Sequence, residues 1–138
     1  MIRAREQQAI SRCRKQVRAL QSEREALEAN LLSREPLVEG SLVTIRKVCG
    51  KAGCRCATSK RMRHGPFLSL SILRRGQTRR IHLPKPWEEQ VRAGVEKARR
   101  YRKAHQQWRD LERRMGVLWK QVERYRKHVP YEPKQKGR

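Results

Sequence analysis

Residues 49–66 read CGKAGCRCATSKRMRHGP, and this segment decides the fold of the chain. Three cysteines and one histidine follow the spacing C-x4-C-x-C-x7-H, at Cys49, Cys54, Cys56 and His64. Structural zinc sites use about four sulfur or nitrogen ligands in a tetrahedron. Glycines stand next to three of the four residues, where a backbone that wraps a metal must turn sharply. The segment therefore predicts a structural zinc site with these four ligands.

Other interpretations of the histidines and cysteines stay open. His82, further along the chain, is the alternative fourth ligand. The thiols could also stay reduced without a metal, or form a redox pair, although a C-x-x-C motif is absent. Cys13 stands among apolar residues at helical spacing, so we expect it to be a small buried hydrophobic residue.

Short segments with strand-like composition flank the cysteines. SLVTIRKV over residues 41–48 is rich in β-branched residues, and FLSLSILR over 67–74 alternates apolar residues with serine. QTRRIHLP over 77–84 follows an Arg75-Gly76 turn. Alternation with period two and a two-residue turn are typical of antiparallel strands. We expect two or three such strands, with the cysteine segment between the first and the second.

Long helical segments stand on both sides of the strands. Residues 2–33 contain no proline or glycine, and a second helix is expected from about 86 to 128. Apolar side chains spaced three and four apart are typical of a coiled coil. In the first helix this seam is interrupted by Arg24 and consists of Ile10, Cys13, Val17, Leu20, Leu27 and Leu31. In the second it is unbroken and consists of Tyr101, Ala104, Trp108, Leu111, Met115, Leu118, Val122 and Tyr125.

Together these elements predict an α+β fold. A long antiparallel helical hairpin, forming a coiled coil, is capped by a two- to three-stranded antiparallel β-sheet with a zinc knuckle. We divide the single domain into a helix at 1–36, a basic β-unit at 37–85, a helix at 86–129 and a disordered tail at 130–138. The second helix is longer by about ten residues, roughly 15 Å. Its far end either overhangs, free for another copy or a protein partner, or is covered by residues 1–9.

Positive charge dominates the sequence and points to a polyanionic partner. The chain has 36 Lys and Arg against 13 Asp and Glu, a net charge of +23, and residues 37–86 hold 12 of the basic residues with one acidic residue. Such charge favours binding to a nucleic acid, because each neutralised phosphate releases counter-ions. Binding to an anionic membrane is a weaker alternative, and so is a surface whose charge only keeps the protein soluble. We expect DNA rather than RNA, with phosphate contacts from Lys51, Arg55, Lys60, Arg61, Arg63, Arg74, Arg75, Arg79, Arg80, Arg99, Arg100, Arg102 and Lys103.

Catalysis and membrane insertion are not expected. Four ligands close a zinc shell, whereas catalytic zinc keeps an open position. The chain has a single aspartate, Asp110, and lacks a phosphate-binding glycine loop. Apolar runs are too short to cross a membrane, and MIRAREQQ has no apolar signal-peptide core. We expect a cytoplasmic protein without a small-molecule substrate. Phe67 is the one aromatic residue near the cysteines, so backbone-led binding to duplex DNA or structured RNA is favoured over base stacking.

The motif CGKAGCRC, followed by HGPFLSLSI and a long helix, resembles a family of small bacterial and archaeal proteins known as a domain of unknown function. Its pattern is roughly CGKxxCxCxxxxxHGPYxxLxxxxxGKTxxxYxP, and the resemblance covers about residues 40–105. Phe67 stands where the family pattern has the Tyr after HGP, and His82 falls near the second Tyr of the pattern. The resemblance implies a shared zinc fold. Because similar genes occur near mobile elements, it also suggests a DNA-binding accessory or regulatory factor. An RNA- or ribosome-associated protein and a coiled-coil adaptor for a protein partner are the alternatives.

Overall fold

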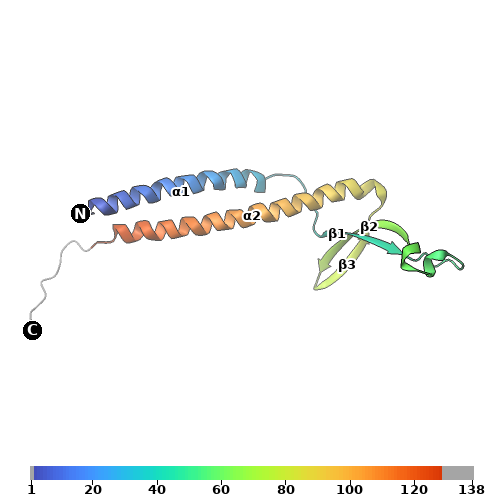
Figure 1. Cartoon of the computed structure of the whole chain (residues 1–138). Helices are drawn as coiled ribbons and strands as arrows, with labels where there is room; N and C mark the ends of the chain where they lie inside the picture. The colour runs from blue at the N-terminus through green and yellow to red at the C-terminus, as the bar shows by residue number, and fades with distance from the viewer. Residues whose placement is uncertain (1, 129–138) are drawn as a thin grey trace, which may run out of the picture. The chain divides into compact units, whose positions relative to one another are not determined.

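The structure is a computed structural model that describes residues 2–128, so the predicted tail at 130–138 lies outside the described residues. The chain forms the helices α1 (Ala4–Leu31) and α2 (Lys85–Arg126) and the strands β1 (Ser41–Lys47), β2 (His64–Arg74) and β3 (Gln77–His82). Two short 3-10 helices, η1 (Arg55–Ala57) and η2 (Lys60–Met62), lie between β1 and β2 (Figure 1). The predicted α+β class is confirmed. No helix among residues 2–128 is long and apolar enough to cross a membrane.

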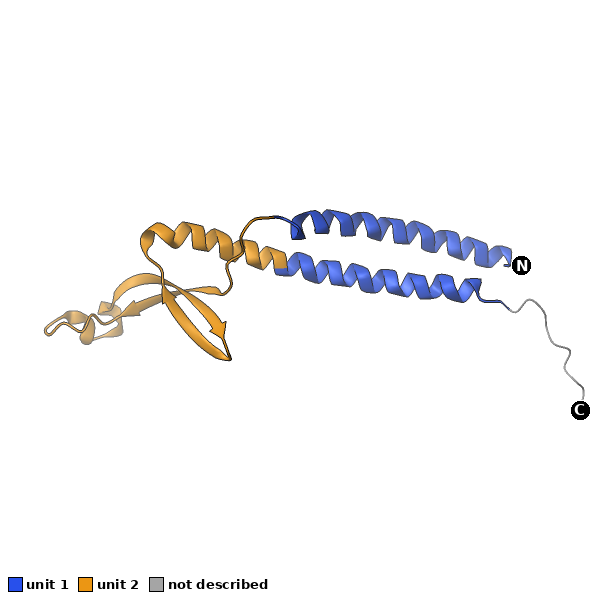
Figure 2. Ribbon diagram, turned by 180° about the vertical axis from the view of Figure 1, so that it is seen from behind, with its two compact units in different colours: residues 1–33, 102–138 blue, residues 34–101 orange. Residues whose placement is uncertain are grey.

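The chain divides into two compact units (Figure 2). The helical unit consists of residues 1–33 and 102–138, and the β-unit consists of residues 34–101. Because α2 runs from the β-unit into the helical unit, each unit contains part of this helix.

In the helical unit, α1 lies antiparallel to the second part of α2. Cys13 contacts Gln121 near one end, and Glu28 contacts Trp108 near the other, so later residues of α1 meet earlier residues of α2. Leu20, Leu111 and Met115 form a buried cluster between the helices. The predicted hairpin is thus confirmed within this unit, and Cys13 is buried as expected. Supercoiling of the helices stays a prediction.

Arg24, which interrupts the apolar seam of α1, has an acidic partner on α2. The Arg24 guanidinium contacts Glu112 at 2.7 Å and Glu28 at 3.3 Å. These carboxylates raise the pKa of Arg24, chiefly through its hydrogen bond with Glu112. The indole N–H of Trp108 donates to Glu28 at 2.9 Å. A polar layer therefore replaces one apolar layer between the helices.

The far end of α2 does not overhang. A groove of about 620 Å³ is lined from both helices, by Ile2 and Ile10 on one side and by Trp119, Val122 and Arg126 on the other. The chain around the start of α1 therefore lies beside the end of α2, as in the alternative in which residues 1–9 cover this end. Trp119 is still 55% exposed.

The β-unit contains the three-stranded antiparallel sheet in the order β1-β2-β3. Arg75 and Gly76 connect β2 to β3 with positive φ angles of 51° and 75°, as a tight hairpin turn requires. The apolar core of the unit is small, with Leu70, Leu83 and Ala98 buried. The largest fully buried side chain is that of Ser69, and its hydroxyl has no hydrogen-bond partner among the described residues. Apolar burial alone therefore gives this unit little stability.

Candidate metal centre and its basic surroundings

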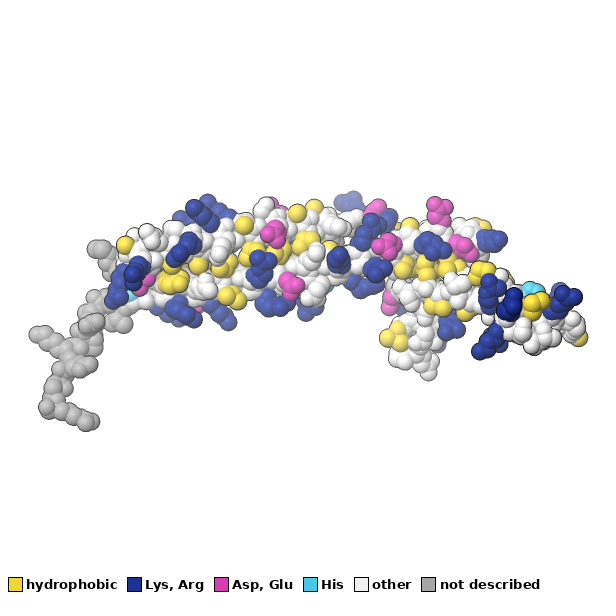
Figure 3. All heavy atoms as spheres, viewed as in Figure 1, with side chains coloured by type: hydrophobic (Ala, Val, Ile, Leu, Met, Phe, Trp, Pro, Cys, Tyr) yellow, Lys and Arg dark blue, Asp and Glu magenta, His cyan; other side chains and the backbone are white. Residues whose placement is uncertain are grey.

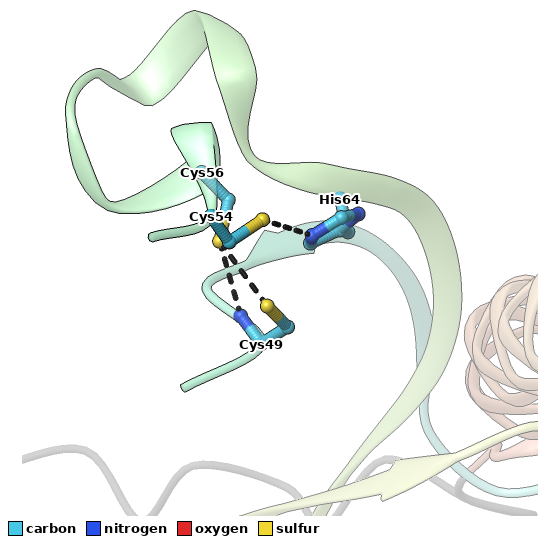
Figure 4. A group of neighbouring side chains, drawn as sticks. All are labelled: Cys49, Cys54, Cys56 and His64. Atoms are coloured by element: carbon cyan, nitrogen blue, oxygen red, sulfur yellow. Dashed lines mark hydrogen bonds between the residues drawn. The ribbon is translucent and has the colours of Figure 1, made fainter. Parts of the chain in front are cut away.

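The four predicted ligands come together at one end of the sheet (Figure 4). Cys49 follows β1, Cys54 immediately precedes η1, Cys56 lies within η1, and His64 begins β2. Their ligand atoms all lie within 4.8 Å of one another, and the side chains point toward a common centre. These residues could hold a metal ion, as the sequence predicts.

Two of the distances between ligand atoms are close to those of a tetrahedral zinc site. Zinc bound at about 2.3 Å to sulfur and about 2.0 Å to nitrogen places sulfur atoms roughly 3.8 Å apart and a sulfur and a nitrogen roughly 3.5 Å apart. The Sγ atoms of Cys49 and Cys56 are 3.5 Å apart, and Cys54 Sγ is 3.3 Å from His64 Nε2. The donor set of three sulfurs and one nitrogen therefore fits a closed shell for a single ion.

Short turns in the loop position the thiols of Cys54 and Cys56. The backbone N–H of Cys54 donates to the Lys51 carbonyl at 3.3 Å, and that of Thr58 donates to the Arg55 carbonyl at 3.0 Å. The Thr58 hydroxyl donates to the same Arg55 carbonyl at 2.7 Å. These bonds wind the chain into η1, which turns Cys56 inward, only 2% exposed. The first turn thus places the thiol of Cys54, and the second places the thiol of Cys56, at the same centre.

Backbone N–H groups also donate to the sulfurs. The Cys49 N–H donates to Cys56 Sγ at 3.4 Å. The pKa of the Cys54 thiol is lowered, chiefly by a hydrogen bond from the Cys56 N–H and further by the neighbouring thiols. At Cys56 the hydrogen bond from the Cys49 N–H is the largest single influence and lowers the pKa of the thiol, but desolvation and the thiols of Cys54 and Cys49 together raise this pKa above its usual value. Such N–H···S bonds orient thiolate ligands in metal sites.

A bulge in the sheet places His64 opposite the end of β1. Ile45 pairs with Phe67, but Lys47 pairs with His64, so β2 holds one extra residue here. Gly65 makes this possible, because it has a φ of 124° and a Cβ there would lie 2.9 Å from the Ile45 carbonyl oxygen. Strand β2 consequently begins at His64, three residues before the predicted start.

His82 is not part of the cluster. Its ring lies edge-on to Phe67, with 5.9 Å between ring centroids. The β3 residue Ile81 faces the other side of the sheet, and His82 pairs with Ser69 of β2. The choice between the two histidines is therefore settled in favour of His64 as the residue beside the thiols.

The predicted phosphate-contacting residues lie in three exposed groups, apart from Arg63, which is half-buried. On the face shown in Figure 3, Lys and Arg side chains gather around the knuckle. The first group lies in the loop, the second around the β2–β3 turn and along β3, and the third on α2 across the boundary of the two units. In that order, they are Lys51, Arg55, Lys60, Arg61 and Arg63; Arg74, Arg75, Arg79 and Arg80; and Arg99, Arg100, Arg102 and Lys103.

Sequence reasoning missed Lys47, whose Nζ atom lies 5.3 Å from the centre of the Phe67 ring. Lys47 stands immediately before the cysteine segment and lies two residues after Ile45, the partner of Phe67, so it is on the same side of the sheet as Phe67. The bulge at Gly65 then places His64 of the cluster opposite Lys47. Its position beside the cluster therefore depends on register, which composition does not show.

A family described as a domain of unknown function, DUF6788, matches residues 10–93. The matched part includes all four clustered residues and the whole sheet. The chain belongs to this family. The match begins at residue 10 in α1 and ends at residue 93 in α2, whereas the resemblance of the motif covers about residues 40–105. We found no match among curated proteins or among solved structures.

Proposed function

We propose that this member of the family is a non-catalytic zinc protein that binds nucleic acid, DNA in preference to RNA, through its β-unit. The metal would hold Cys49, Cys54, Cys56 and His64, and the exposed basic side chains around it would contact phosphates. Three sulfurs and one nitrogen in a tetrahedron are the ligand set of structural zinc. A filled shell leaves no position for a substrate or an activated water.

The uncompensated charge of the β-unit carries this proposal. Residues 37–86 hold 12 basic side chains and one acidic side chain, Glu39. Glu39 forms an exposed ion pair with Arg74 at 3.7 Å, which leaves the other basic residues of this stretch without an acidic neighbour from the stretch itself. Phosphates of a nucleic acid would supply the missing negative charge and release counter-ions.

The helical unit provides the contrast that makes the proposal testable. It is also basic, but its described cations include several that pair with carboxylates, such as Arg24 with Glu112 and Lys127 with Glu123. Charges that already have partners gain less from a phosphate. We therefore expect the β-unit to dominate binding.

The test is the salt dependence of binding to a blunt 20-base-pair duplex, measured by fluorescence anisotropy. Each lost phosphate contact lowers the slope of log affinity against log salt by about 0.9. The double variant Arg79→Gln/Arg80→Gln should lower the slope by about one, because the two exposed side chains face opposite sides of β3 and a duplex on either face loses one contact. The matched control is Arg109→Gln/Arg114→Gln, two exposed arginines on α2 in the helical unit. Equal losses in the two variants would contradict the proposal.

Competition with a structured RNA hairpin at physiological salt tests the preference for DNA. We expect the DNA duplex to displace the RNA more readily than the reverse. If the RNA competes better, the RNA-associated alternative replaces this proposal. Binding that is weak and insensitive to salt for both would favour the protein-adaptor alternative.

A further inference from the structure

A cavity opens beside the metal cluster on the β-unit. It has a volume of about 510 Å³, and its walls include Lys47, Val48, Lys51 and Phe67 in addition to parts of the cluster itself. Pockets for small ligands usually span about 300–1,000 Å³. The volume of this cavity is therefore within the range of pockets that take a ligand of nucleotide size.

The cavity has apolar walls that solvent can reach. Val48 is 45% exposed, and the half-buried ring of Phe67 forms another wall. The ring is held from the side by His82, which meets it edge-on at an interplanar angle of 71°. A planar, weakly polar ligand would cover apolar surface that is otherwise left to water.

Outside the cluster itself, the charged side chains at the cavity are positive. The ammonium of Lys47 lies 5.3 Å from the centre of the Phe67 ring, and Lys51 lines the same space. Among the described residues, no carboxylate lines the cavity. The chemistry therefore calls for a ligand that joins a planar ring to an anionic group, and an anion would draw the Lys47 ammonium off the ring face.

We propose that the cavity takes one unpaired base of a bound nucleic acid, with a neighbouring phosphate against Lys47 and Lys51. This inference rests on the proposed function and adds a ligand class to it, a nucleotide outside the duplex stack. It also revises the expectation of purely backbone-led binding. Arg80 lies on the same side of β3 as His82, because strand side chains alternate, so it can hold the adjoining backbone.

The experiment uses the full chain loaded with zinc and three labelled DNA duplexes. One is blunt and fully paired, one carries a single bulged adenine, and one carries an abasic bulge at the same position. Contact between a base and an aromatic ring makes a difference of about ten-fold in affinity. We expect the adenine bulge to bind about ten-fold more tightly than the paired duplex, and the abasic bulge to bind like the paired duplex. Equal affinity for the two bulges would overturn the inference, because only bending would then be recognised.

Variants locate the effect. Phe67→Ala should abolish the preference for the adenine bulge and leave the affinity for the paired duplex within about two-fold. The matched control is Leu73→Ala, an apolar residue 64% exposed on the same strand and outside the cavity, which should keep the preference. If Phe67→Ala loses its metal, Lys47→Gln replaces it as the test variant and should reduce the preference for the adenine bulge. A preference that survives in the variant that keeps its metal would overturn the inference.

The outcomes separate this inference from the proposed function. Normal binding to the paired duplex without any preference for the adenine bulge would remove the cavity proposal alone. Absence of binding to all three duplexes would remove both.

Discussion

The two units of this chain reach a stable fold by different means. The helical unit buries Cys13, Val17, Leu20, Leu111 and Met115 between its helices and pairs Arg24 with Glu112 across them. The β-unit buries few apolar side chains and instead gathers three thiols and an imidazole within 4.8 Å. We infer from this difference that a metal bound at the cluster would compensate for the small apolar core of the β-unit. Each prediction below affects one unit and is expected to leave the other unchanged.

The largest effect is expected from Cys54→Ser. Metal-binding free energy is folding free energy where the site exists only in the folded state. The variant should therefore lose its metal and unfold the sheet, while α1 and the part of α2 beside it stay helical. Loss of dispersed amide signals for residues 41–82 in an NMR spectrum, with most helical circular dichroism retained, would show this.

Cys13→Ser is the matched control for this variant, because Cys13 is the cysteine outside the cluster. It should keep one metal ion per chain. A folded sheet in metal-free Cys54→Ser would break the comparison between the units.

Leu111→Ala is expected to destabilise the helical unit and to leave the β-unit unchanged. Leu111 is 4% exposed and packs in the cluster with Leu20 and Met115. Removing a buried leucine side chain costs about 2–5 kcal/mol. Thermal unfolding of the helical unit should shift down accordingly, while metal content stays at one ion per chain. If the metal were released at the same temperature as the helices melt, the units would be one cooperative structure.

Trp108→Phe tests how much the polar layer between the helices contributes to stability. The variant removes the indole N–H that donates to Glu28 at 2.9 Å. A lost hydrogen bond in a partly buried site costs about 1 kcal/mol. Denaturant unfolding should report this loss. Trp119→Phe is the control, since Trp119 is 55% exposed, and it should change stability by less than about 0.5 kcal/mol.

The smallest effect is expected at the end of α2. Lys127 lowers the pKa of Glu123 through a hydrogen bond and its charge, so this pair stabilises the helix above the unfolded pKa of the carboxyl group. The stabilisation is lost as pH falls through the lower pKa of the folded state. Glu123→Gln should therefore lower the melting midpoint by no more than about two degrees at neutral pH. In acid the variant and the parent should melt together, and a difference that persisted there would assign the effect to another cause.

Much of this architecture follows from local sequence signals. The spacing of Cys49, Cys54, Cys56 and His64 predicts the cluster, because short turns can bring residues so close in sequence to one centre. The apolar repeats predict both helices, and only the helix ends differ by a few residues.

Features that depend on register could not be predicted in this way. Arg24 interrupts an apolar seam in sequence, and its partner Glu112 becomes visible only once the two helices are aligned. The cavity beside Phe67 depends on the bulge that brings Lys47 across from His64. Supercoiling and the proposed partners remain predictions.

The most direct test of the central claim is the metal content of the purified full chain. We expect one zinc ion per chain by elemental mass spectrometry, and unfolding of the β-unit when a strong chelator removes the ion. A chain that contains no metal, yet keeps a folded sheet with the thiols of Cys49, Cys54 and Cys56 freely reactive, would contradict this claim.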